Sequence, residues 1–255
     1  MRDILNEAVG SNPDPVKVAA RSQRDDLPKR FYKEARAVET GSGYELRLDG
    51  RPARTPGRSL VATASRRIGE AIAAEWNAQS ERIDPVSMPI TRTLNSAIDG
   101  VSPRMDDVRS DIAAFAGSDL LCYRADEPAR LVERQAASWD PVLKRFANEG
   151  ARFSLATGIM PIDQPPGALN RVREMLADET DPLQLAALHI ATTLTGSALL
   201  ALAVQRQWIE ADDAWSAAHV DEDWNIQLWG EDAEASARRD QRKRDYDAAT
   251  FILLD

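Results

Sequence analysis

Acidic and aromatic side chains gather in one segment of the chain, Gln207 to Ala237. This segment holds nine acidic residues and no Lys or Arg, together with four of the six tryptophans. Carboxylates can carry protons or pair with cations, and tryptophans provide large apolar contact areas. Disordered acidic tails are poor in aromatics, and buried helices are poor in carboxylates. The composition therefore predicts an ordered helix with an anionic, aromatic face.

Helical spacing places part of this segment on one stripe. The residues that recur at intervals of three and four are Trp215, Ala218, Glu222, Ile226 and Trp229. Two interpretations of Glu222 stay open. It can pair with His219 or with another basic residue of the chain, or it can meet a cation of a binding partner, since interface cores favour aromatics. The second interpretation makes Glu222, Asp223, Trp224 and Trp229 candidate partner-binding residues.

Residues suited to catalysis or metal binding are few. The two histidines, His189 and His219, accompany no nucleophile motif such as Gly-x-Ser-x-Gly, and each is expected to be a core or surface residue. A metal at His219 and Glu222 would need further ligands that spacing alone does not supply. No Walker loop or Gly-x-Gly-x-x-Gly motif is present, and adjacent carboxylates such as Asp212-Asp213 usually coat a solvated face. We expect no catalytic residue, no cofactor, no metal and no small-molecule substrate.

Charge is distributed unevenly along the chain. Residues 1–60 carry 12 basic and 9 acidic side chains, whereas the remainder carries 20 basic and 32 acidic ones. An anionic surface repels phosphate backbones and suits a basic patch on a protein partner, so we expect no nucleic-acid binding. A basic run follows the acidic segment and is expected to pair within its helix or to interact with a helix C-terminus. It consists of Arg238, Arg239, Arg242, Lys243 and Arg244.

Composition indicates a soluble globular protein, with 43% hydrophobic and 29% charged residues. No apolar run approaches the roughly 20 residues that cross a bilayer. The best candidate, Leu183 to Val204, contains polar residues and is expected to be a buried helix, so no membrane insertion is predicted. No signal or transit peptide is visible, and the single cysteine, Cys122, excludes an internal disulfide. We expect a reducing, bacterial cytoplasmic location.

The pattern changes from strands to helices near residue 60. Tyr44, Leu46 and Leu48 alternate with polar residues as in a half-buried strand, and Asp49-Gly50 is a type I′ hairpin signal. We expect a flexible arm over 1–29, a β-rich domain over 30–64 with three or four antiparallel strands, and a helical domain over 65–255. Strands followed by helices indicate the α+β class.

Apolar spacing and capping signals predict the helices of the second part. Ile68, Ile72 and Trp76 lie four residues apart, and Trp76 is expected to be a core residue. Further helices are expected after Ser102-Pro103, near Pro128 and after Asp181-Pro182, the last one continuing to Ala198.

Several segments, in order, resemble the ATP synthase alpha-subunit assembly chaperones. The first blocks are Leu48-Asp49-Gly50-Arg51-Pro52, Thr55-Pro56, Glu75-Trp76 and Met88-Pro89-Ile90-Thr91 with Asn95. The later blocks are Cys122-Tyr123-Arg124, Glu127-Pro128, Gln135 with Trp139-Asp140-Pro141, and Asp223 to Gly230 with Glu234-Ala235 and Arg238. The resemblance covers about residues 30–250.

The resemblance implies a small β-rich domain joined to a helical one, and a function without chemistry. Members of this family bind the free alpha subunit of ATP synthase and prevent its aggregation until beta subunits join. They depend on acidic residues of the helical domain, and Glu222 is the matching candidate, beside Asp221 and Asp223. Two other classes remain as alternatives: an acidic helical scaffold or adaptor for another partner, and a carboxylate-based hydrolase.

Overall fold

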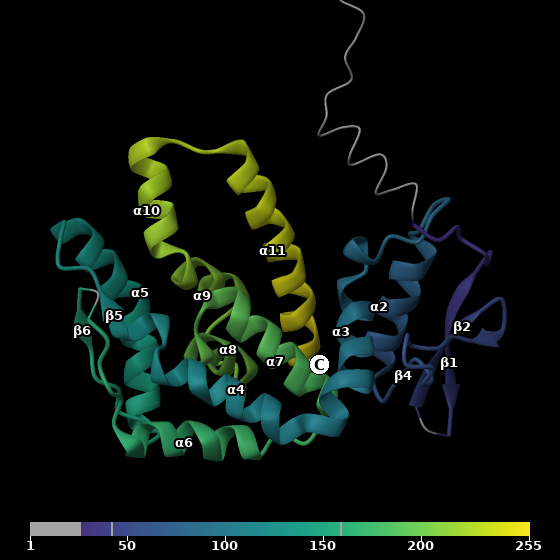
Figure 1. The fold of residues 1–255 in the computed structure, drawn as a ribbon, viewed down its shortest axis with the longest axis horizontal. Coiled ribbons are helices and arrows are strands. Elements are labelled where there is room, and N and C mark those ends of the chain that lie inside the picture. The colour runs from purple at the N-terminus through teal and green to yellow at the C-terminus, as the bar shows by residue number, and fades with distance from the viewer. Residues whose placement is uncertain (1–26, 42, 159) are drawn as a thin grey trace, which may run out of the picture.

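The computed structural model describes residues 27–41, 43–158 and 160–255. A small antiparallel sheet is followed by a larger part that is mostly helical (Figure 1), which confirms the predicted α+β class. Residues 1–26 of the predicted arm lie outside the described residues. Its last three residues do not extend freely, because Ile83 N donates to Pro28 O at 2.9 Å and Lys29 forms a bridge with Arg82.

The strands form two sheets, and the helices fill the rest of the described chain. The strands are β1 (Ala35–Thr40), β2 (Gly43–Leu48), β3 (Arg51–Pro52), β4 (Ala62–Thr63), β5 (Tyr123–Arg124) and β6 (Ala156–Thr157). The helices are α2 (Arg66–Asn77), α3 (Pro89–Ser96), α4 (Met105–Gly117), α5 (Ala129–Asn148), α6 (Pro166–Ala177), α7 (Pro182–Thr195), α8 (Ala198–Gln205), α9 (Ala211–Ala218), α10 (Val220–Trp229) and α11 (Ala233–Leu253). Single turns of 3₁₀ or π helix lie at Pro85–Ser87, Ala97–Val101, Ser102–Arg104 and Leu120–Cys122.

Strand β2 is the centre of the first sheet. It pairs antiparallel with β1 along one edge and with β3 and β4 along the other. Leu46 and Leu48 are buried, as the alternating pattern predicts. Asp49 and Gly50 both have positive φ angles, 47° and 81°, as a type I′ turn requires. The first strand of the predicted β-rich domain begins at Ala35.

Helix α2 packs against this sheet. Ser65 caps its N-terminus by accepting a hydrogen bond from Ile68 N, and Ile68 and Ile72 are buried. Gly69 permits the close approach, because a Cβ at this position would lie 2.9 Å from the Cβ of Tyr44. Trp76 contacts the core, as predicted, but part of its surface stays exposed.

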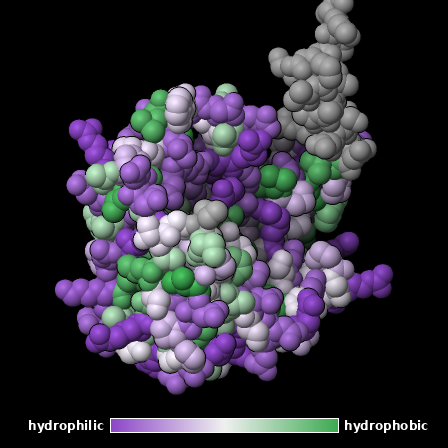
Figure 2. Space-filling view, turned by 60° about the vertical axis from the view of Figure 1, so that its left-hand side comes forward, coloured by the Kyte–Doolittle hydropathy of each residue, from purple (hydrophilic) through white to green (hydrophobic). Residues whose placement is uncertain are grey.

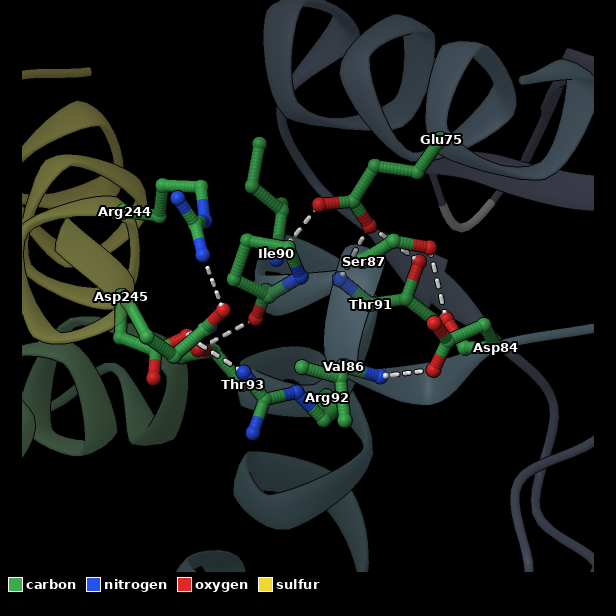
Figure 3. A network of polar contacts seen from close by, with 12 residues as sticks. Glu75, Asp84, Val86, Ser87, Ile90, Thr91, Arg92, Thr93, Arg244 and Asp245 are labelled. Carbon is green, nitrogen blue, oxygen red and sulfur yellow. Dashed lines mark hydrogen bonds and ion pairs between the residues drawn. The ribbon is translucent and has the colours of Figure 1, made fainter. Parts of the chain in front are cut away.

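Glu75 joins α2 to the N-terminus of α3 (Figure 3). Its carboxylate accepts hydrogen bonds from Ile90 N at 2.8 Å, Thr91 N at 2.8 Å and Thr91 Oγ1 at 2.6 Å. A helix N-terminus favours negative charge, yet burial raises the pKa of Glu75 against the effect of these bonds. On the other side of α3, Arg92 binds Asp245 of α11. Two sequence blocks of the resemblance thus form one contact between α2 and α3.

Helices α7 and α8 form the interior of the helical part. The predicted single helix from Pro182 to Ala198 is wrong at its end. The chain turns at Gly196, which has a φ of 66°, and α8 starts anew with Ser197 as its N-cap. Residues 198–204 are all buried. No helix in the described part of the chain has both the length and the apolar character needed to cross a membrane.

The buried carboxylate of Asp119 stabilises the turn between α7 and α8. Asp119, fully shielded from solvent, accepts from Ser197 Oγ at 2.7 Å, from Leu199 N at 3.0 Å and from Leu121 N at 3.1 Å. It therefore caps α8 from a different part of the chain. Burial raises the pKa of Asp119 from 3.8 to about 6, although these hydrogen bonds favour the charged form.

Asp119→Ala should lower the free energy of unfolding by about 2–4 kcal/mol, because buried donors lose their acceptor. The folded state binds the carboxyl proton more tightly than the unfolded state, so the stabilisation that Asp119 provides falls as pH rises from about 4 to about 6. The cost of the variant, measured by urea unfolding, should accordingly be larger at the acidic end. Asp126→Ala, an exposed control, should change stability little throughout. A cost that grows with pH would mean that the hydrogen bonds outweigh desolvation.

Candidate functional site

The acidic, aromatic segment folds as three helices rather than as the single helix that its spacing predicts. Helix α9 ends at Ala218, α10 ends at Trp229 just before Gly230, which has a φ of 89°, and Asp232 caps α11 by accepting from Ala235 N at 2.8 Å. The predicted stripe is therefore divided. Trp215 is buried against His219 and Tyr246, whereas Trp229 is 84% exposed.

Helix α5 holds the junction between α9 and α10. Trp139 is fully buried, and its indole N–H donates to Ala217 O in the last turn of α9 at 2.7 Å. Gln135, one turn earlier, donates to the carboxylate of Asp221 in the first turn of α10 at 2.7 Å. Buried donors of this kind need acceptors. The spacing of Gln135 and Trp139 in the sequence is therefore explained by their two contacts on consecutive helices.

The segment before α5 supports the same residues. The guanidinium of Arg124 lies 5.0 Å from the ring centroid of Trp139 and binds Asp140 at 2.7 Å. Ala125 N donates to Gln135 Oε1 at 2.9 Å, so the side-chain amide of Gln135 uses both its oxygen and its nitrogen. Two of the sequence blocks thus converge beneath α9 and α10.

Helix α10 turns different candidate residues in different directions. Trp224 faces α5, where the guanidinium of Arg134 lies 5.2 Å from its ring centroid. Asp223 forms an ion pair of 2.6 Å with Arg239 of α11. Glu222 and Trp229 line a groove between α10 and α11. The four predicted residues therefore do not form one surface. Trp224 packs towards α5, Asp223 joins α10 to α11, and Glu222 and Trp229 line the groove.

The groove lies where α10 and α11 diverge from the loop that joins them (Figure 1). Its volume is about 650 Å³. The α10 side contributes Glu222, Asn225, Ile226 and Trp229, and the loop and α11 contribute Glu231, Asp232, Ala235, Ser236, Arg239 and Asp240. Since Arg239 is paired with Asp223, the charge that remains on the lining is negative. The groove thus combines carboxylates with an exposed indole.

Glu222 does not form a charged pair with His219. The two side chains are 3.8 Å apart, between Nε2 and a carboxylate oxygen. Burial lowers the pKa of His219, so its ring is neutral at neutral pH. Nδ1 lies 2.7 Å from Trp215 O, which can only accept, and so Nδ1 carries the proton and Nε2 has none to donate. The negative charge of Glu222 is therefore available to a partner.

The basic run on α11 forms intramolecular pairs. Arg238 and Lys243 pair within the helix with Glu234 and Asp247, as predicted. Arg239 and Lys243 also reach other helices, at Asp223 and Asp212. Arg242 donates instead to Leu194 O, the last turn of α7, at 2.7 Å.

Sequence reasoning missed the α11 side of the groove and the exposed Leu228, which is 56% accessible beside Trp229. The sequence does contain a signal for the break between α10 and α11. Gly230 followed by Asp232 is typical of one helix ending and another beginning. Reading it would have placed Ala235 and Arg239 opposite α10 instead of on the same helix.

Groups that could support other chemistry are buried or dispersed. Burial raises the pKa of the Cys122 thiol to about 12, and it lowers the pKa of His189. Within residues 27–41, 43–158 and 160–255, no cluster of three or more His, Cys, Asp or Glu side chains could hold a metal ion. The groove between α10 and α11 is therefore suited to binding by charge and apolar contact.

Comparison with known proteins agrees with the sequence blocks. A family model described as ATP12 chaperone protein matches residues 29–147. The crystal structure of Atp12 from Paracoccus denitrificans is 38% identical, with a TM-score of 0.81 over 89% of this chain and 97% of that one. The crystal structure of a candidate chaperone from Agrobacterium tumefaciens is 44% identical, with a TM-score of 0.86 over 96% of this chain and 92% of that one. The chain therefore belongs to the ATP12 chaperone family, the ATP synthase assembly chaperones that its sequence blocks resemble.

Proposed function

We propose that this chaperone binds the unassembled alpha subunit of ATP synthase in the groove between α10 and α11 and prevents its aggregation. The observation that carries the proposal is that Glu222 and Trp229 line one open groove while the opposite side of α10 is fixed to α5. A subunit built for a ring exposes apolar patches before assembly, and such patches aggregate. An indole beside carboxylates can cover a patch of this kind that has a basic rim.

The surface around the groove supports reversible binding. Hydrophilic residues cover most of the face in Figure 2, and apolar residues form small patches among them. Trp229 and Leu228 are exposed together at the end of α10, next to Glu231 and Asp232. A chaperone must release its client when beta subunits arrive. A partly polar interface meets this need, because area alone does not set affinity.

The contacts of the three neighbouring carboxylates single out Glu222. Asp221 accepts a hydrogen bond from Gln135, and Asp223 is paired with Arg239. Glu222, with 38% of its side chain exposed, lies 3.8 Å from the neutral ring of His219, and no Lys or Arg of the described residues pairs with it. An unpaired carboxylate can steer the approach of a client cation, and some close charge pairs in interfaces add net affinity. Glu222 is therefore the carboxylate of this block that we assign to the client.

Glu222→Lys should weaken protection of the alpha subunit by about tenfold or more, because an attraction is replaced by repulsion. Its free energy of unfolding should change by less than about 1 kcal/mol, as for most surface substitutions. Light scattering of alpha subunit diluted from denaturant, at graded chaperone concentrations, measures the first quantity, and thermal unfolding measures the second.

The matched control is Glu174→Lys on α6, an exposed residue far from the groove (Figure 1). This control should protect the client as the wild type does. Equal losses of stability and protection in Glu222→Lys would indicate a structural role beside His219. Full protection by Glu222→Lys would remove this residue from the site.

Trp229→Ala should leave the melting temperature unchanged, because its side chain is 84% exposed. Protection should fall by about tenfold or more, since exposed aromatics that become buried dominate interface energies. Leu155→Ala, which removes a side chain that is 53% exposed outside the groove, is the control. If both variants protect the client equally well, Trp229 is not a client contact. A client other than the alpha subunit that is protected equally well would favour a general adaptor.

A further inference from the structure

Residues of the first sheet and the end of α2 line a second hollow. These elements lie away from α10 and α11 (Figure 1). The volume of the hollow is about 610 Å³. We call it the aromatic pocket and define it by Phe31, Tyr32, Trp76, Pro52, Arg51 and Arg54. The β2–β3 hairpin forms one wall, and the end of α2 with the segment before β1 forms the other.

The rings of the aromatic pocket are held in place by one another. Phe31 meets Tyr32 edge-on with centroids 5.4 Å apart, and Tyr32 lies 5.4 Å from Trp76. The hydroxyl of Tyr32 donates to Trp76 O at 2.7 Å, which fixes the middle ring. Phe31 nevertheless remains 73% exposed. A large aromatic that is both oriented and exposed is typical of binding surfaces.

The charge available at the aromatic pocket is positive. The carboxylate of Asp49 also lines the pocket and stays negative, because hydrogen bonds from Glu34 N and Lys33 N hold its pKa below the usual range, but two guanidinium groups outnumber it. Arg51 is exposed, and no carboxylate of the described residues pairs with it. Arg54 donates to a carbonyl, Arg58 O, at 2.7 Å, and no carboxylate of residues 27–41, 43–158 and 160–255 pairs with it. Both guanidinium groups are therefore free to meet carboxylates, in contrast to the acidic groove.

We infer that the aromatic pocket binds an extended segment of the client that carries an apolar side chain flanked by carboxylates. The inference rests on the proposed function, since the client is the same alpha subunit. Phe31 and Trp76 contact the apolar side chain, and Arg51 and Arg54 pair with its acidic neighbours. The protein thus holds its client at two surfaces of opposite charge. Only one ring is well exposed, and single-stranded nucleic acids need several rings for successive bases, so the pocket fits a polypeptide better.

The test uses the full chain with Arg51→Glu or Phe31→Ser, assayed for suppression of alpha-subunit aggregation. Both residues are exposed, so the melting temperatures should equal that of the wild type. Each variant should need about tenfold more protein for half-maximal protection. Arg173→Glu on α6 makes the same charge change far from both surfaces and should protect normally. Added salt should weaken the wild type more than Arg51→Glu, because one ion pair is missing in the variant.

Four outcomes decide the matter. Losses in both pocket variants but not in Arg173→Glu support the inference. If both pocket variants protect as the wild type does and Trp229→Ala loses protection, the inference is overturned and the proposed function stays intact. If all variants protect normally, Trp229→Ala included, both are overturned. Binding of a fluorescein-labelled single-stranded DNA that Arg51→Glu abolishes, with client protection unchanged, would make the pocket a nucleic-acid site and would also overturn the inference.

Discussion

The orientation of α10 depends on the hydrogen bond from Trp139 to Ala217. The last carbonyl groups of a helix have no partner within the helix, and the indole N–H of a fully buried tryptophan requires an acceptor. One bond satisfies both groups and fixes the end of α9 on α5. Gln135 makes a similar contact with the next helix, because its side-chain amide donates to Asp221 in the first turn of α10. With these contacts made, α10 starts in a direction that separates it from α11, and a groove opens between them.

The fold could be predicted wherever the signals are local. Alternation of apolar and polar residues predicts β2, the Asp49-Gly50 pair predicts its hairpin, and the Asp181-Pro182 pair predicts the start of α7. The end of α7 could not be found from apolar spacing, because residues 198–204 continue an apolar run beyond the turn at Gly196. The turn between α7 and α8 depends on Asp119, which lies far away in the sequence. The spacing of apolar residues within the helix cannot predict such a contact.

The candidate site was predictable in composition but not in arrangement. The unusual pairing of carboxylates with indoles drew attention to Glu222 and Trp229, and both line the groove. Trp224 belongs to the same pattern, yet it faces Arg134 on α5, a partner that no periodicity within residues 207–237 could reveal. The same holds for Arg239, whose pairing with Asp223 removes a positive charge from the groove lining. Sequence spacing assigns residues to a helix face, and only tertiary contacts decide which charges stay free.

Free charge also distinguishes the two surfaces of the molecule. Near the sheet, no carboxylate of the described residues pairs with Arg51; at the groove, Arg239 pairs with Asp223, and no Lys or Arg of the described residues pairs with Glu222. Internal ion pairs thus leave an unpaired charge of opposite sign at each of the two surfaces. The sequence has a basic excess in residues 1–60 and an acidic excess in the remainder. The aromatic pocket and the groove carry these same signs of charge. A client that met only one sign could turn about the contact, whereas opposite signs on separate elements impose a single orientation.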